Sequence, residues 1–417
     1  MLVSTPSNIP SKPWWIVRGG MLLALTVLAF NLRPLASSVG PVLPQLETDV
    51  GLTGTTAGIL TSLPTACFAV IGAIAPTLAR RFGLHRVIGV GILAIIMGGV
   101  ARTQVSDPAS FLGLSAIGLA GMALSNVLAP SVVRQHFAHH VGLVTAFYSL
   151  TLSIGVAVSS AFTVPLATAF GTWRGAFLVW CVPVLISLLV WVPALRHDRG
   201  HSERRATTTR AISLASVART RLGWMLGIFF GFQSAQAYSI FGWLPSIYMA
   251  AGLSQTEAGA MLGICTGLGI PLAFLWPAYM GRNPRPTALF IVVVACGLAG
   301  YIGLLTAPAT LPWLWASLIA IGTSSFPMIL ALFGLRARTA EGTAALSGFA
   351  QTIGYCIAIF GPLTLGIVHE QTHSWFWPVL ALTLFTVPMT IAGFASIASG
   401  DIEDQLPHRP AQPSPHP

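Results

Sequence analysis

Hydrophobic residues along this chain form long, nearly unbroken runs that are separated by short stretches of polar and charged residues. Most runs match or exceed the ~20 residues that an α-helix needs to cross a bilayer, and they lack the alternating ten-residue pattern of a transmembrane β-barrel. The pattern therefore predicts an all-α integral membrane protein with twelve transmembrane helices. These are expected at residues 16–45, 55–79, 86–104, 109–133, 142–170, 174–195, 222–249, 256–280, 287–306, 311–335, 342–368 and 375–398.

The composition agrees with this class. Mean hydropathy is +0.78, hydrophobic residues make up 54% of the chain and charged residues only 8%. A soluble domain has about a quarter charged residues, so this chain cannot cover itself with a surface compatible with water. The lipid bilayer is the partner that the composition requires.

The net charge of +10 follows from membrane topology rather than from nucleic-acid binding. Of the 21 Lys and Arg residues, all but Arg33, Arg102 and Arg174 lie in the N-terminus, in alternate loops or in the C-terminal tail. This distribution follows the positive-inside rule and predicts that both termini are cytoplasmic. No nucleic-acid partner is expected.

The twelve predicted helices divide into two groups of six. An N-terminal half (1–195) and a C-terminal half (222–399) are joined by a long, Arg-rich cytoplasmic loop (196–221). The tail (400–417) is rich in proline and is expected to be disordered.

The two halves repeat each other at a constant offset of 201 residues. The matched pairs are Leu43-Pro44 with Leu244-Pro245, Gly51-Leu52 with Gly252-Leu253, and Ala57-Gly58 with Ala258-Gly259. Two parallel six-helix repeats are similar to the major facilitator fold, in which substrate binds near the midplane between the halves and access alternates between the two sides. The repeat therefore predicts a transporter.

Arg33 is the strongest candidate for a binding residue. It lies 15 residues after Arg18, about 22 Å into a hydrocarbon core about 30 Å thick. An ionisable residue at such depth is costly and indicates function, and no Asp, Glu, Lys or His lies deep in the predicted spans. An anionic or strongly dipolar substrate, or water in an open cavity, is therefore expected to neutralise or solvate Arg33. The alternative is a structural role, in which its side chain snorkels or satisfies unwound carbonyls near Pro34 and Pro41. The missing membrane-embedded carboxylate also favours facilitated movement or exchange over proton coupling.

Other polar residues in the spans form a second set of candidates for the substrate site. The alternative is that they make ordinary hydrogen bonds between helices. The set is Ser37, Asn126, Tyr148, Gln233, Gln236, Tyr238, Gln351 and Tyr355.

A third set consists of prolines, which remove backbone hydrogen-bond donors, and one glycine, which adds flexibility. These residues are expected to kink or gate the helices; they are Pro34, Gly40, Pro41, Pro44 and Pro245.

The sequence does not favour an enzyme or a metalloprotein. It has no catalytic triad, HExxH motif or Walker-type phosphate loop, and His136, His139 and His140 cluster in a short basic loop. We expect no catalytic residues, no metal site and no cofactor.

Several segments resemble one known family. Residues 31–46 read NLRPLASSVGPVLPQL, and ILTSLP (59–64), APSVVRQHF (129–137), GWLPSIY (242–248), FPMILAL (326–332) and GFAQTIGY (348–355) follow in order. These segments resemble the CynX/NimT branch of the major facilitator superfamily, which contains cyanate transporters and 2-nitroimidazole exporters. The resemblance implies a bacterial inner-membrane carrier of small anionic or polar nitrogen-containing compounds, without a cofactor, which we expect to be a monomer. It also matches Arg33, Pro245 and Gln351 to residues of the family's motifs.

The chain departs from the broader superfamily between the second and third helices. A Gly-x-Leu-Ala-Asp-Arg motif is usual there, whereas this chain has Pro76 and Arg80 in place of the glycine and the aspartate. Any lock on the cytoplasmic side must then be built differently. A multidrug exporter and a membrane sensor that does not translocate remain as alternative functions.

Overall fold

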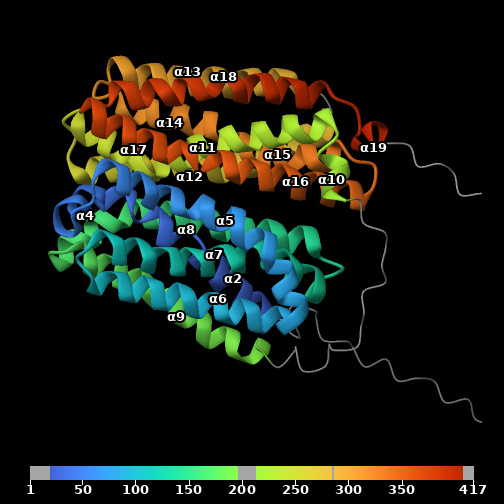
Figure 1. The fold of residues 1–417 in the computed structure, drawn as a ribbon, viewed down its shortest axis with the longest axis horizontal. Coiled ribbons are helices and arrows are strands. Elements are labelled where there is room, and N and C mark those ends of the chain that lie inside the picture. Colours follow the sequence, from blue (N-terminus) through green and yellow to red (C-terminus); the bar gives the residue numbers. More distant parts are fainter. Residues whose placement is uncertain (1–18, 196–212, 284–285, 407–417) are drawn as a thin grey trace, which may run out of the picture.

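The computed structural model describes residues 19–195, 213–283 and 286–406, and its helices form two stacked halves (Figure 1). The N-terminal half contains α2 (Gly19–Asn31), α3 (Pro34–Ser37), η1 (Gly40–Val42), α4 (Leu43–Val50), α5 (Gly54–Phe82), α6 (Leu84–Ala101), η2 (Arg102–Gln104), α7 (Pro108–His136), α8 (Val141–Phe170) and α9 (Trp173–Trp191). The C-terminal half contains α10 (Leu214–Val217), α11 (Arg221–Ala250), α12 (Gln255–Arg282), α13 (Thr287–Thr306), α14 (Pro312–Thr323), α15 (Ser325–Leu335), α16 (Ala340–Ala358), α17 (Phe360–Thr372), α18 (Phe376–Ala398) and α19 (Ile402–Gln405).

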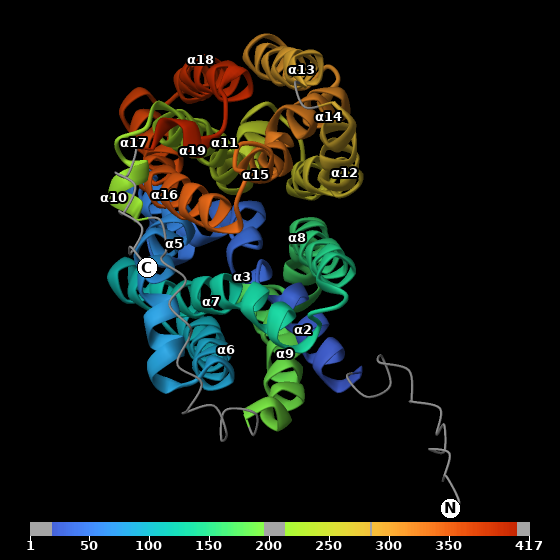
Figure 2. The same ribbon diagram turned by 90° about the vertical axis from the view of Figure 1, so that its right-hand side faces the viewer.

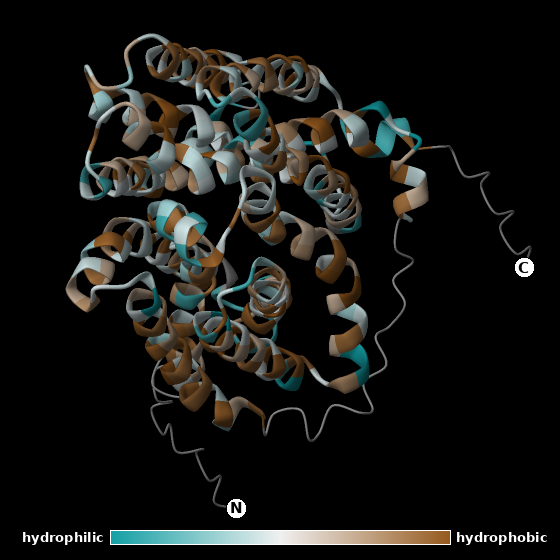
Figure 3. Cartoon of the chain, turned by 60° about the vertical axis from the view of Figure 1, so that its left-hand side comes forward, coloured by the Kyte–Doolittle hydropathy of each residue, from teal (hydrophilic) through white to brown (hydrophobic). Residues whose placement is uncertain are grey.

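The all-helical fold with twelve spans agrees with the prediction. The described residues contain eleven helical runs that are long and apolar enough to cross a membrane. The twelfth span is α11, which has 30 residues and whose buried residues include Gln233, Ser234 and Gln236. Since α11 packs against α12, α16, α17 and α18, its polar residues are shielded from lipid. In Figure 3 the long helices are largely apolar and the hydrophilic colour is strong at α19.

The internal repeat extends to details of helix termination. Gly51 and Gly252 both have positive φ, +75° and +98°, which only glycine adopts readily. Thr53 and Ser254, also 201 residues apart, are the N-caps of α5 and α12, and each forms a capping box with the residue three positions later. The same turn therefore joins the first two helices of each half.

Three of the twelve spans are discontinuous, and each break lies close to a proline. The first span is interrupted after Asn31 and continues as α3, η1 and α4, in the stretch that contains Pro34, Pro41 and Pro44. The tenth span breaks at Ser324 and the eleventh at Ile359, three residues before Pro327 and Pro362 respectively. The α11 helix is continuous through Pro245.

Hydrogen bonds between the halves gather at one end of the molecule, which we call the closed end and which contains α4 and the end of α17. There, Thr55 donates from its backbone nitrogen (2.6 Å) and its hydroxyl (2.5 Å) to one Glu370 oxygen. Gln255 donates to the Pro41 carbonyl at 2.9 Å and accepts from Gln45 at 3.2 Å. Because these bonds join α4, η1 and α5 to α12 and α17, they hold the two halves together.

Glycines let the two backbones approach each other at the closed end. A Cβ atom on Gly40 would lie 2.2 Å from the Phe241 carbonyl oxygen, and one on Gly366 would lie 2.2 Å from the Gly54 carbonyl oxygen. Both distances are far inside van der Waals contact, so these positions require glycine in this conformation. Small residues at helix contacts allow this kind of packing in membranes.

The opposite end, which we call the α19 end, carries α10 and α19. Figure 2 views the molecule from this end and shows the two halves meeting along α5 with α16 and α8 with α12. The expected long loop (196–221) is partly ordered, since α10 and the first residue of α11 lie in it; residues 196–212 lie outside the described residues.

The expectation of a disordered tail from residue 400 onward is wrong for its first residues. The Ile402 amide donates to the Arg336 carbonyl at 2.8 Å, and Arg338 pairs with Asp401 at 2.9 Å and with Asp404. Residues 407–417 of this predicted tail lie outside the described residues. The acidic side chains of α19 explain the order, because they bind the basic loop between α15 and α16.

This C-terminal contact predicts a pH dependence of stability. Burial raises the pKa of Glu403, but hydrogen bonds from the backbone of Arg338 and from Thr339 outweigh it and hold the pKa below its usual value. A carboxyl group whose pKa is lower in the folded protein than in the unfolded chain stabilises the fold at pH values above the unfolded pKa, which is about 4.3 for Glu. This stabilisation is lost as the pH falls through the folded pKa. The thermal midpoint of the wild type should therefore drop between about pH 5 and pH 3 by more than that of Glu403→Gln. Parallel curves for the two proteins would contradict this assignment.

Candidate substrate site

A cavity of about 210 Å³ lies between the two halves. Its lining comes from α8, α11, α12, α14, α15 and α16, together with Arg33 from the break in the first span. The polar residues that line it are Arg33, Ser153, Gln233, Ser234, Tyr238, Thr266, Thr323, Ser324 and Tyr355. Among the residues that the structure describes, no carboxylate and no histidine lines this cavity.

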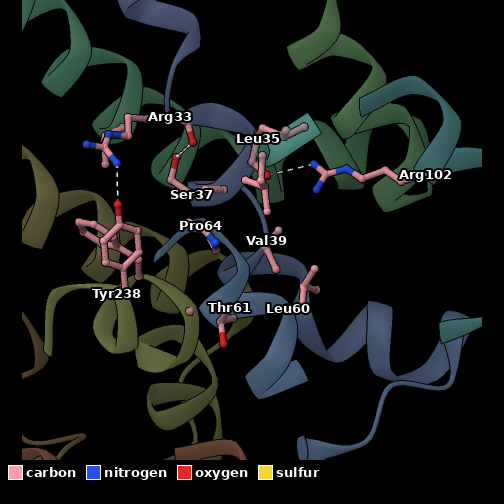
Figure 4. Close-up of a pocket in the computed structure, with 14 residues that line it drawn as sticks. Arg33, Leu35, Ser37, Val39, Leu60, Thr61, Pro64, Arg102 and Tyr238 are labelled. Carbon is pink, nitrogen blue, oxygen red and sulfur yellow. Dashed lines mark hydrogen bonds between the residues drawn. The ribbon is translucent and has the colours of Figure 1, made fainter. Parts of the chain in front are cut away.

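Arg33 is the second of the two residues between α2 and α3, where the helix is interrupted. Its Nη1 donates to the Tyr238 hydroxyl at 2.8 Å, across the interface between the halves (Figure 4). Its guanidinium lies 5.5 Å from the centroid of the Phe68 ring. Within the described part of the chain, no carboxylate forms an ion pair with it. Arg33 therefore presents a charged, planar donor group to this cavity, whose other described polar lining residues are neutral.

Gln233 is held by the break in the tenth span. Pro327 has no N–H and cannot bond to the carbonyl four residues earlier, that of Thr323. Gln233 donates its Nε2 to this carbonyl at 2.9 Å, and its Oε1 accepts from the Ser234 hydroxyl at 3.3 Å. The proline therefore frees a carbonyl that fixes an amide side chain at the cavity wall.

Aromatic rings form the wall next to Arg33. Phe68 and Tyr355 stack across the halves with centroids 5.0 Å apart and planes at 15°. Phe230 meets Tyr355 edge-on at 5.0 Å, and Tyr238 meets Phe241 in the same way at 5.9 Å. Such faces favour flat, polarizable molecules. The site therefore combines one positive charge, hydrogen-bonding hydroxyls and aromatic surfaces.

The structure brings four of the nine predicted binding residues together at the cavity: Arg33, Gln233, Tyr238 and Tyr355. Ser37 lies just beyond them, hydrogen-bonded to Ser159 at 2.6 Å, and lines a separate narrow pocket.

The other four predicted residues do not line this cavity. Asn126 accepts a hydrogen bond from Tyr148 at 3.0 Å within the N-terminal half. Gln236 points toward α18, where it donates to the Met389 sulfur at 3.3 Å. Gln351 donates to Ser347 at 2.6 Å, one helical turn from Tyr355.

Arg33 is not the only buried cation among the described residues. Arg102, from η2, is 2% exposed and donates its Nη2 to the Leu35 carbonyl at 3.2 Å. It lies near the end of the predicted third span (86–104), a position from which a long side chain can reach water. Instead its side chain turns inward, because the broken first span offers the Leu35 carbonyl and Phe177 offers its ring face at 4.2 Å.

Sequence reasoning also missed the hydroxyls of the tenth span. Thr323 and Ser324 line the cavity, and Ser324 accepts a 2.6 Å hydrogen bond from the Trp276 indole. The available signal was the run of hydroxyl residues, Thr323 to Ser325, directly before Phe326-Pro327. Hydroxyls beside a helix-breaking proline in a membrane span indicate a polar, irregular segment.

Comparison with known proteins agrees with the fold and the repeat. The model of the Major Facilitator Superfamily matches residues 21–362. The uncharacterized transporter YycB of Bacillus subtilis is 34% identical over 93% of this chain and 94% of its own length. The 2-nitroimidazole transporter of Escherichia coli is 34% identical over 90% and 95%, and the cyanate transport protein CynX of Escherichia coli is 28% identical over 90% and 97%.

Solved structures give the same architecture. The crystal structure of a D-xylose-proton symporter superposes with a TM-score of 0.72 at 17% identity, covering 93% of this chain and 98% of the symporter. At this identity the likeness concerns the fold. The alignments with the 2-nitroimidazole transporter and with CynX each cover 90% of this chain and nearly all of the relative. The chain therefore belongs to the CynX/NimT family of the Major Facilitator Superfamily and is a multi-pass secondary transporter of a small molecule.

Proposed function

We propose that the protein carries a small, flat, anionic or strongly polar nitrogen-containing compound, of the cyanate or nitroimidazole kind, and that Arg33 binds it. The observation that supports this best is the unpaired guanidinium facing a cavity lined by neutral residues. An unpaired buried charge is costly, and an anionic or strongly dipolar substrate at this position removes the cost. The two relatives named for 2-nitroimidazole and cyanate transport agree with this substrate class.

The binding residues that we infer are Arg33, Gln233, Tyr238 and Tyr355. Arg33 supplies charge and a planar pair of donors, which suits a nitro, carboxylate or cyanate group. Tyr355, stacked with Phe68, supplies a ring face for a planar ligand, and Gln233 and Tyr238 supply neutral polar contacts. We assign Asn126, Tyr148, Gln236 and Gln351 to the packing of the helices around the site, since their side chains bond within one half.

A multidrug exporter of cations fits the cavity poorly. Within the described residues, Arg33 is the one charged group of the lining, and it repels cations; no carboxylate of these residues lines the cavity to attract them. Export of neutral or anionic toxic compounds remains compatible with the proposal, since the geometry does not depend on the direction of transport.

We infer that 1–195 and 222–399 are the two moving halves, joined by 196–221. The basic residues at the α19 end favour a cytoplasmic position for that end and for both termini, in the inner membrane of a bacterium. On this orientation the structure is the inward-facing state. We expect a monomer without a nucleic-acid partner, because the site lies within one chain and the basic residues follow the membrane topology.

The test is flux across a membrane. Purified protein in proteoliposomes should take up radiolabelled cyanate or 2-nitroimidazole down a concentration gradient, and should exchange internal for external label faster than empty liposomes do. An excess of unlabelled substrate should compete with the label. A membrane sensor would bind the ligand in a thermal-shift assay but show no flux above that of empty liposomes, and this outcome would reject the carrier function.

A further inference from the structure

A second, narrower cavity of about 20 Å³ adjoins Arg33 on the side of the closed end (Figure 4). Arg33 and Arg102 both line it, together with Leu35, Ser37 and Val39 from the broken first span. The rest of the lining comes mainly from α5 and α11, with Leu119 of α7 and Val156 of α8. Arg33, from the break in the first span, and Arg102, from η2, thus line one small cavity from two sides, and in Figure 4 the segment that contains Leu35 and Ser37 lies between them.

Arg102 has more hydrogen-bond donors than partners. Its Nη2 bonds to the Leu35 carbonyl, but its Nε and Nη1 have no hydrogen-bond partner and are shielded from solvent. Its guanidinium lies over the Phe177 ring at 4.2 Å and near the Phe111 ring at 6.0 Å, and these rings compensate only part of a desolvated charge. None of the ion pairs found among the described residues involves Arg102.

No acidic side chain from the described part of the chain lines this cavity. Two cations beside one cavity, without a carboxylate, leave an excess of positive charge in a region of low dielectric constant. A neutral water can accept hydrogen bonds from Arg102, but it cannot remove this charge. An anion does both.

We propose that this narrow cavity is a binding site for a compact monovalent anion of the size of a halide ion, anchored by the free Nε and Nη1 of Arg102. The cavity holds about one water-sized body, since a single water needs roughly 10–15 Å³. A nitroheterocycle or another planar organic molecule is too large for it. The site is therefore distinct from the larger cavity, and its occupant is a resident inorganic ion and not the organic substrate.

The position of the site connects it to the transport cycle. Phe241 and Gly242 of α11 close it on the side of the C-terminal half, whereas Arg102 and Leu35 belong to the N-terminal half. Separation of the halves at the closed end moves α11 away and opens this wall. The anion is thus enclosed in the present conformation and gains an exit when the closed end opens.

The direct test uses bromide as the probe and the full-length wild-type protein. Crystals grown in sodium bromide should give an anomalous peak within hydrogen-bond distance of Arg102 Nε or Nη1. A peak beside Arg33 in the larger cavity alone, or no peak in crystals that diffract well enough to detect one, would overturn the proposal.

A second measurement uses thermal unfolding in detergent, with sodium chloride compared with sodium gluconate at equal ionic strength. Chloride should raise the wild-type midpoint by about 2–5 °C, as expected for a ligand at many times its dissociation constant. Arg102→Gln should lose this rise, and Arg102→Lys should retain part of it. The matched control is Arg80→Gln, which removes an exposed charge at the end of α5, where Arg80 contacts Thr77, and should respond to chloride as the wild type does.

Equal chloride responses in Arg102→Gln and the wild type would reject the site. If Arg102→Gln does not fold, the bromide peak in the wild type decides the matter. Neither readout requires transport or a known organic substrate, so this proposal and the proposed function can fail independently.

Discussion

Arg33→Gln should lower kcat/KM for transport by about 30-fold or more, because it leaves an anionic or dipolar substrate without its charged donor. Truncating one partner of a buried, hydrogen-bonded charge pair costs about 2–5 kcal/mol, and each 1.4 kcal/mol corresponds to about tenfold. Arg33→Lys keeps the charge but loses the planar fork, so it should fall between Arg33→Gln and the wild type. Initial uptake rates in proteoliposomes at several substrate concentrations measure the effect.

Two control variants separate binding from folding. Tyr238→Phe removes the 2.8 Å bond to Arg33 but leaves the guanidinium, so its effect should be several-fold smaller than that of Arg33→Gln. Arg80→Gln removes an exposed charge at the end of α5, whose contact is with Thr77 at 3.1 Å, and should transport normally. If Arg33 serves only to satisfy freed carbonyls, Arg33→Gln will lower the thermal midpoint and the yield but leave KM unchanged.

Gly40→Val should shift the protein away from the conformation described above. A side chain at Gly40 meets the Phe241 carbonyl at 2.2 Å, so the closed end cannot close without moving α11. Overpacking of this kind costs about 1–3 kcal/mol, which moves a two-state population by about 5- to 150-fold. Uptake should slow because one of the two alternating states becomes rare.

The shift can be measured as a distance between two spin labels. Phe82 and Tyr279 are exposed near the ends of α5 and α12, on opposite halves at the α19 end. After replacement of the native cysteines, labels at these two positions should move closer together in Gly40→Val. The matched control is Gly113→Val on α7, where an added Cβ meets nothing within 4 Å; an equal change in this control would contradict the prediction.

The sequence was most informative where local chemistry determines structure. Hydropathy located the spans because lipid tolerates only helices with internally satisfied backbones. The 201-residue offset paired Gly51 with Gly252, and both lie in turns with a positive φ, which glycine adopts more readily than other residues. Three prolines, Pro34, Pro41 and Pro44, marked the break in the first span, whereas the single Pro245 leaves α11 continuous.

The composition of the cavity was less predictable because it depends on how helices rotate about their axes. Gln233 and Gln236 share a helix and a polar character, yet one faces the cavity and the other faces Met389 on α18. The long side chain of Arg102 can reach either water or the Leu35 carbonyl, and only the packing of the broken first span selects the carbonyl. The pattern of residues along a single helix does not determine which way these side chains point.

The contact between Glu370 and the first turn of α5 has a consequence for the energetics of transport. The carboxylate of one half accepts from the Thr55 amide of the other, at a helix start where amides lack partners. When the halves separate, water can take over both sides of this contact. The ion pairs found among the described residues each lie within one half. Separation of the halves therefore replaces the hydrogen bonds between Glu370 and Thr55 with bonds to water and breaks none of these ion pairs. The strength of this contact should therefore depend little on ionic strength, because none of these ion pairs joins the two halves.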